Sequence, residues 1–124
     1  MSTSALAEAK HLVEETWRQS SRWEGNLLAA QGHLEGALRA EPDGVPLLTG
    51  LGAVLCDRGR YKEAARFLHK AILLGSKDRN THFAMAIVVF NTKSHAEGTA
   101  LFLSAAKLEP SPETWQAYFD PQAH

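Results

Sequence analysis

Residues 45–78 read VPLLTGLGAVLCDRGRYKEAARFLHKAILLGSKD, and this stretch decides the fold. Apolar residues recur at helical spacing on either side of Gly59, which can adopt positive φ and so end a helix there. Ala64 and Ala71 are two helical turns apart and therefore share one face, where small side chains let a neighbouring helix approach closely. Gly52 offers the same close approach on the preceding helix. The stretch therefore predicts two helices that pack tightly against each other.

The pattern of this stretch recurs along the chain with a period of 34 residues. Two of the matching columns are Ala37, Ala71 and Ala105, and Leu34, Leu68 and Phe102. A fixed period of about 20 to 50 residues indicates a small unit that cannot bury its apolar face alone and stacks on copies of itself. The prolines of AEPDG at 40–44 and EPSP at 109–112 end the outer units, because proline removes a backbone donor and clashes with the preceding turn.

The middle unit resembles a tetratricopeptide repeat, a pair of antiparallel helices of about 34 residues. The residues that carry the resemblance are Leu48, Leu51, Gly52, Leu55, Gly59, Tyr61, Glu63, Ala64, Leu68 and Ala71. The first unit keeps Gly25, Ala30, Leu34, Ala37 and Pro42, and the third keeps Ala86, Glu97, Phe102, Ala105 and Pro110. The resemblance implies an all-α, right-handed superhelix of three helix hairpins. We expect one domain over 1–124, with repeats at about 11–44, 45–78 and 79–112 and a tail at 113–124.

The helices of these units are expected at about 13–17, 26–40, 45–58, 61–74, 79–92 and 95–108, the first extended toward residue 3. The tail ETWQAYFDPQAH carries three aromatic residues, Trp115, Tyr118 and Phe119. We expect it to form a short helix that caps the third hairpin, since terminal elements of a solenoid often cover its open end.

Composition restricts the compartment and the partner. No stretch approaches the ~20 apolar residues that span a bilayer, and MSTSALAEAKHL lacks a signal-peptide pattern, so we expect a cytoplasmic chain without membrane insertion. A single cysteine, Cys56, cannot form an internal disulfide, which fits a reducing compartment. The net charge of −1 gives no general attraction to nucleic acid.

Nothing in the sequence predicts an enzyme, a metal site or a cofactor. The six histidines never occur three or four residues apart, so no helix presents two of them on one face; they are His11, His33, His69, His82, His95 and His124. The sequence contains no HExxH, CxxC or GxSxG motif and no glycine-rich phosphate loop. Cys56 has apolar neighbours and is interpreted as a small buried thiol. We therefore predict a non-enzymatic chain with no catalytic residue, no cofactor and no metal.

The family resemblance implies a concave surface lined mainly by the first helix of each hairpin. The inward-looking positions carried over to this chain are Leu12, Glu15, Gln19, Arg22, Trp23, Pro46, Thr49, Ala53, Cys56, Asp57, Asn80, Phe83, Ile87, Phe90 and Asn91. Ten of them are our candidate partner-binding residues: Gln19, Arg22, Thr49, Ala53, Cys56, Asn80, Phe83, Ile87, Phe90 and Asn91. Some relatives hold a peptide's terminal carboxylate with Lys and Asn, and that set is absent, since Glu15 and Gln19 occupy two of its positions.

Phe83, Ile87 and Phe90 form an apolar stripe at helical spacing. The helix at 79–92 is apolar nearly all round, and such a helix is usually buried on every side. Three interpretations stay open: the stripe packs within the fold, it contacts a client peptide, or it pairs with a second copy of the chain. The chain's own tail is one of the elements that could cover it.

We interpret the chain as a protein-interaction module that binds an extended or helical apolar peptide in its concave groove. It is also similar to the small class II chaperones of type III secretion systems, which are three-repeat cytosolic proteins that tend to dimerise. A structural subunit of a larger scaffold is the other alternative. Residues 58–79 carry a net +5 and residues 1–57 a net −4. These charges are either solvated or complementary in self-association or partner binding, so a homodimer stays open beside a protein or peptide partner.

Overall fold

The computed structural model describes residues 2–119, with side chains from residue 5 onward. Its elements are α1 (Ser2–Arg18), a 3₁₀ turn η1 (Ser20–Arg22), α2 (Trp23–Ala40), α3 (Val45–Asp57), α4 (Tyr61–Leu73), α5 (Arg79–Thr92) and α6 (His95–Ala105). No strand occurs between residues 2 and 119. The prediction of six helices is confirmed, although α6 ends at Ala105, before the expected end at residue 108.

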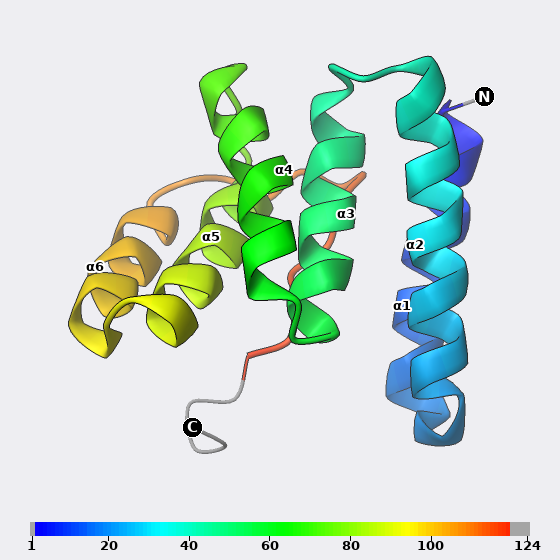
Figure 1. Ribbon diagram of the computed structural model, residues 1–124, viewed down its shortest axis with the longest axis horizontal. Helices are drawn as coiled ribbons and strands as arrows, with labels where there is room; N and C mark the ends of the chain where they lie inside the picture. The colour runs from blue at the N-terminus through cyan, green and yellow to red at the C-terminus, as the bar shows by residue number, and fades with distance from the viewer. Residues whose placement is uncertain (1, 120–124) are drawn as a thin grey trace.

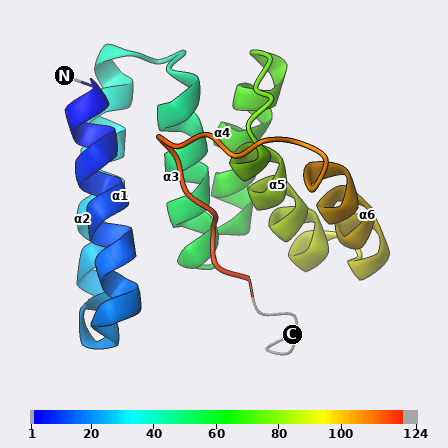
Figure 2. The same cartoon turned by 180° about the vertical axis from the view of Figure 1, so that it is seen from behind.

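Consecutive helices pair into three hairpins that follow one another from one end of the molecule to the other (Figure 1). The hairpin α1–α2 forms one end and α5–α6 the other, with α3–α4 between them. The first helices of the hairpins also contact one another, α1 against α3 and α3 against α5. Their shared face is turned toward the viewer in Figure 2.

Glycines end both helices of the middle hairpin, and the prediction for Gly59 is confirmed. Gly59 follows α3 with φ +73°, and Gly75 follows α4 with φ +95°, and both values lie in the left-handed region that glycine adopts freely. Polar caps begin the last two helices. The Asp78 side chain accepts the backbone N–H of Asn80 at the start of α5, and Ser94 caps α6 in the same way.

Two glycines allow helices to approach closely within their hairpins. A Cβ added at Gly52 of α3 would overlap the side chain of Leu68 on α4. A Cβ added at Gly98 of α6 would lie 2.6 Å from the Cα of Phe90 on α5. Ala64 and Ala71 of α4 have no exposed surface. The predicted close approach at Gly52, Ala64 and Ala71 is therefore confirmed.

The core centres on α3 rather than on α5. Every residue from Leu47 to Cys56 is buried, since α3 has neighbours on both sides and the tail across its face. In α5, Phe83 and Phe90 are only half-buried, so this helix is less enclosed than its composition predicted. None of the described helices is both long enough and apolar enough to cross a bilayer.

The tail differs from the prediction. Between residues 106 and 119 the chain forms turns and extended backbone, so the expected short capping helix is wrong for this part; residues 120–124 lie outside the described residues. The chain turns back over the start of α5 and runs down the face of α3, between α1 and α5 (Figure 2). Burial alternates, with Trp115 and Ala117 buried and Gln116 and Tyr118 exposed. A period of two belongs to an extended segment with one face against a surface, and this alternation explains why a helix is not formed.

Candidate partner-binding face

One face of the molecule already holds an extended peptide, which is the chain's own C-terminal part. We call residues 111–119 the tail segment, and the surfaces of α1, α3 and α5 that it covers the tail-binding face. Trp115 to Tyr118 is three extended residues, which span about 10 Å. The tail contacts α3 first near Gly50 and then at Asp57, seven helical residues later, a rise of about 10.5 Å. The two lengths match, so the extended segment from Trp115 to Tyr118 lies along α3 between Gly50 and Asp57.

Trp115 is the apolar anchor of the tail segment, with only 7% of its surface exposed. Its ring lies over Gly50 of α3, where an added Cβ would be 2.9 Å from Cη2 of the indole. The same added Cβ would lie 3.3 Å from Leu6 of α1 and 3.4 Å from Leu34 of α2. The indole therefore fills a site between the first two hairpins that the absence of a side chain at Gly50 creates.

The start of α5 holds the start of the tail through hydrogen bonds. One oxygen of Asp78 accepts the backbone N–H of Ser111 at 2.9 Å, and the other accepts the Thr114 hydroxyl at 2.5 Å. The amide of Asn80 donates to the Thr114 hydroxyl oxygen at 2.9 Å. On the α1 side, the Lys10 ammonium donates to the carbonyl of Pro112 at 2.5 Å. Side chains thus bind two backbone groups at the start of the tail, the N–H of Ser111 and the carbonyl of Pro112.

Asp57, at the end of α3, holds the far end of the tail. Its Oδ1 accepts the backbone N–H of Tyr118 at 2.8 Å, whereas its buried Oδ2 has no hydrogen-bond partner among the described residues. Burial raises the pKa of Asp57 to about 7, and the hydrogen bond from Tyr118 opposes the rise. Burial also raises the pKa of the Cys56 thiol, with the charge of Asp57 adding to the effect, so this thiol is not an activated nucleophile.

Aromatic rings surround the last described residues of the tail. The ring of Phe119 lies 4.9 Å from that of Phe90 and 4.7 Å from that of Phe102, between centroids. The ring of Tyr118 lies 5.2 Å from that of Trp17 at the end of α1. Such separations are typical of favourable aromatic pairs, so both rings add to the attachment of the tail.

Among the ten candidate residues, Asn80 and Phe90 contact the tail segment directly. Phe83 reaches it through Phe102, whose ring centroid is 4.9 Å away. Four others are buried between helices: Thr49, Ala53, Cys56 and Ile87. The Thr49 hydroxyl pairs with the Thr81 hydroxyl at 2.6 Å, which joins α3 to α5 beneath the tail.

The remaining three candidates lie at the edges of the first and third hairpins. Gln19 and Arg22 are exposed between α1 and α2, where Arg22 pairs with Glu15 at 3.1 Å. The side chain of Asn91 donates to the Ile87 carbonyl of its own helix at 2.8 Å. The structure therefore brings most of the α3 and α5 candidates together and leaves Gln19 and Arg22, between α1 and α2, apart from them.

Five residues that contact the tail were not among the inward-looking positions: Lys10, Trp17, Gly50, Asp78 and Phe102. Gly50 carried a signal, since an additional glycine in an apolar helix often marks a close approach. Asp78 also carried one, as the cap of α5. Neither signal predicts which segment of the chain packs against Gly50 or binds to Asp78.

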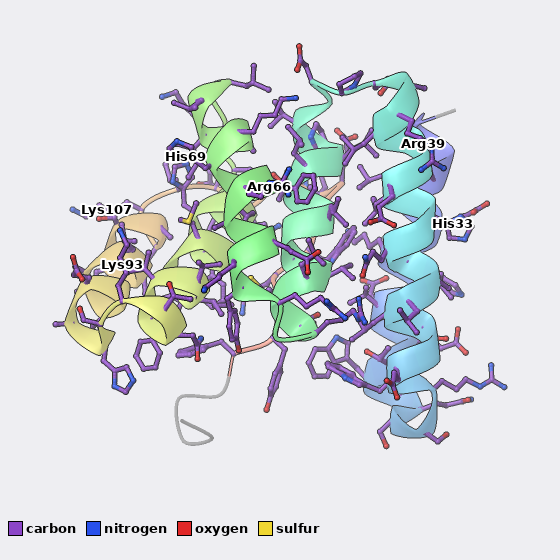
Figure 3. The ribbon with its side chains drawn as sticks, in the orientation of Figure 1. His33, Arg39, Arg66, His69, Lys93 and Lys107 are labelled. Atoms are coloured by element: carbon purple, nitrogen blue, oxygen red, sulfur yellow. The ribbon has the colours of Figure 1, made fainter. Side chains whose placement is uncertain are left out.

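The basic residues of α4 lie away from the tail-binding face. Arg66 and His69 project from α4 on the side turned toward the viewer in Figure 3, whereas the tail passes behind α3. Lys70 pairs with Asp43 at 3.2 Å, so part of the charge asymmetry is neutralised within the chain. Among the described residues no group of three or more histidine, cysteine or acidic side chains could hold a metal ion. The absence of a cofactor stays a prediction.

Comparison with known proteins identifies the family. Residues 24–88, more than half of the chain, match the family model described as tetratricopeptide repeat. The matched range runs from α2 into α5 and contains the whole α3–α4 hairpin. The comparisons with curated proteins and with solved structures gave no match. The chain therefore belongs to the tetratricopeptide repeat family.

Proposed function

We propose that this chain is a non-enzymatic protein-interaction module whose tail-binding face, the concave groove of the repeats, receives an extended apolar segment of a partner protein. Tetratricopeptide repeats generally mediate protein–protein interactions. The observation that carries the proposal is the tail segment itself. An extended peptide lies on the first helices of the hairpins, with its tryptophan buried and its backbone held by side chains.

The chemistry of the tail-binding face supports a peptide rather than a rigid surface as the ligand. Asp57 and Asp78 accept backbone N–H groups, which every residue except proline supplies. The site above Gly50 and the rings of Phe90 and Phe102 accept apolar side chains at alternate positions. An extended segment presents these two kinds of group together, because its backbone is unpaired and its side chains alternate.

We propose that the ten candidate residues divide by role. Asn80, Phe83 and Phe90 contact the partner segment, and Thr49, Ala53, Cys56 and Ile87 form the packed support beneath it. Gln19, Arg22 and Asn91 lie at the edge of the interface.

We further propose a cytoplasmic chain with a protein partner rather than nucleic acid. The single cysteine supports the location, and the net charge of −1 supports the choice of partner.

The test begins with affinity capture from the native cell and identification of retained proteins by mass spectrometry. Binding of the purified partner is then measured for the wild-type chain, for Phe83→Ala/Phe90→Ala, and for Leu73→Ala, a control on the exposed side of α4. We expect the double variant to lose at least ~2 kcal/mol of binding, because buried aromatic anchors carry much of an interface's free energy. The control should bind as the wild type does.

Urea unfolding of the same three proteins separates binding from folding. Unchanged affinity in a stable double variant would rule out the face. A loss of ~3 to 5 kcal/mol of folding stability for each substitution would show that the two rings belong to the core, and would count against their proposed contact with a partner.

A second function, as a structural subunit of a larger scaffold, is favoured by the open end of the array. Leu103 of α6 is 66% exposed and Leu101 is 38% exposed. No charged residue occurs from Gly98 to Ala106, so this end helix presents an apolar surface. A scaffold subunit should copurify in a stoichiometric complex that Leu103→Glu disrupts, whereas a client-binding module should keep its client in that variant.

A further inference from the structure

The tail segment occupies the same face that we propose for the partner, so the tail and the partner cannot bind to this face at the same time. Its attachment has three separate parts: the Asp78 and Asn80 hydrogen bonds, the Trp115 site, and the Asp57 hydrogen bond with the aromatic rings around Tyr118 and Phe119. No helix or strand forms within residues 106–119, so the tail can leave without breaking a helix.

The fit of the tail is incomplete at two buried polar atoms. The indole Nε1 of Trp115 and the Oδ2 of Asp57 are both buried, and neither has a hydrogen-bond partner among the described residues. Leaving buried polar atoms unpaired costs free energy, so these two atoms weaken the attachment of the docked tail. The tail therefore has the character of a ligand that can leave the face.

We propose that the tail segment is an intramolecular ligand of the tail-binding face, and that a partner replaces it with an extended segment of the same form, Thr-Trp-x-Ala-x-Phe. This inference deepens the proposed function and rests on it. Each position of the form corresponds to a contact. The threonine hydroxyl meets Asp78 and Asn80, the tryptophan fills the site at Gly50, and the phenylalanine meets Phe90.

The small residue of the form has its own reason. Ala117 is 1% exposed, so the face leaves no room for a larger side chain there. The x positions correspond to Gln116 and Tyr118, which are exposed and can vary.

A tethered ligand lowers the apparent affinity of every competitor. The tail is joined to α6 by a short connection, and such tethering gives an effective concentration in the millimolar range. The apparent dissociation constant of a competing segment equals its intrinsic value divided by the fraction of chains whose tail is undocked. Weakening the tail should therefore strengthen binding of the same segment added in trans.

The test uses a labelled synthetic peptide of residues 109–119, EPSPETWQAYF, and fluorescence anisotropy with three full-length chains. These are the wild type, Trp115→Ala, and Gln116→Ala, a control at an exposed position of the same segment. We expect the peptide to bind Trp115→Ala at least about tenfold more tightly than the wild type, and Gln116→Ala to behave as the wild type. A peptide with alanine in place of its tryptophan should bind none of the three.

Equal binding of the peptide to Trp115→Ala and to the wild type would overturn the proposal. A wild-type dimer that Trp115→Ala converts to a monomer would also overturn it, because the tail would then dock on a second copy. If Trp115→Ala fails to fold, hydrogen exchange in the wild type decides. A docked ligand should open locally, so the Tyr118 amide should exchange at least about 100-fold faster than the slowest amides of α3. Equal rates would make the tail a part of the core.

The inference and the proposed function can fail separately. A partner that is retained while the peptide does not bind the opened face would overturn the intramolecular ligand alone. The reverse case is also distinguishable. The peptide could bind Trp115→Ala more tightly than the wild type and Gln116→Ala while neither the wild type nor Trp115→Ala retains a partner protein. That result would support the intramolecular ligand and count against the proposed function.

Discussion

The α3–α4 hairpin and the tail segment both pack against α3, and they do so by different means. The interface within the hairpin depends on steric fit, since Gly52 leaves room for Leu68 and the small Ala64 and Ala71 are fully buried. At the tail, one large ring is combined with hydrogen bonds to Asp78, Asn80 and Asp57. The first interface resembles a domain core, and the second resembles a complex between a protein and a peptide. The comparison teaches that a single helix can serve both as core and as binding surface.

The largest expected effect tests the hairpin. Gly52→Ala should destabilise the chain by about 3 kcal/mol, because the new Cβ overlaps the side chain of Leu68, which is fully buried. Urea unfolding measures the loss, and Gly32→Ala on α2 is the matched control, since nothing lies within 4 Å of a Cβ at that position. A loss below about half a kcal/mol for Gly52→Ala would mean that α3 and α4 are not in close contact.

The next effect tests the tail. Trp115→Ala should cost about 1 to 3 kcal/mol, less than the ~3 to 5 kcal/mol of a tryptophan in a core, because the loss cannot exceed the free energy with which the tail docks. Circular dichroism should show unchanged helix content, since the tail contains no helix. A loss of helix content together with a loss of folding stability near 5 kcal/mol would show that the tail interface is part of the core, as the α3–α4 interface is.

A third prediction concerns pH. The pKa of Asp57 is about 7 in the folded chain against an ordinary value of 3.8, so the folded chain keeps a proton that the unfolded chain releases in that window. The unfolded state then binds fewer protons, and the free energy of unfolding should fall as pH rises from about 4 to about 7 and level off above it. Asp57 is coupled to two other titratable groups, Cys56 and Tyr61, whose pKa values are raised partly by its charge.

Asp57→Asn should flatten this slope, because asparagine is neutral and its carbonyl oxygen can still accept the N–H of Tyr118. Urea unfolding at pH 5 and pH 8 gives the comparison, and the stability advantage of the variant over the wild type should be larger at pH 8 than at pH 5 by about 1 kcal/mol or more. Identical slopes in the two proteins would place the Asp57 carboxylate in water.

The smallest expected change in stability is that of Gly32→Ala, the control for Gly52→Ala. Gly32→Ala should stabilise the chain by about 0.5 to 1 kcal/mol, since alanine is the better helix former and the added methyl group meets nothing. The same chemical change thus has opposite signs at Gly52 and Gly32. A loss of stability at Gly32 would indicate that another molecule approaches α2 closely in solution, which size-exclusion chromatography would detect.

The sequence by itself determined the helices and how they pair. Glycine at positions 59 and 75 ends two helices by local backbone geometry, and the alanine columns with a period of 34 residues identify the faces that meet. These are short-range properties, because each depends on residues within a few helical turns. The candidate residues on α3 and α5 follow from the family resemblance, and Asn80 and Phe90 among them contact the tail.

Only the tertiary structure decided where the tail lies. ETWQAYF is compatible with a helix and with an extended segment, and the choice depends on whether a complementary surface exists. That surface is assembled from Leu6, Gly50, Asp57 and Asp78, which lie far from the tail in the sequence and meet only when three hairpins have stacked. No local pattern encodes a contact between positions 61 residues apart, such as Asp57 with Tyr118, because its free energy arises from burial and hydrogen bonding in the completed fold.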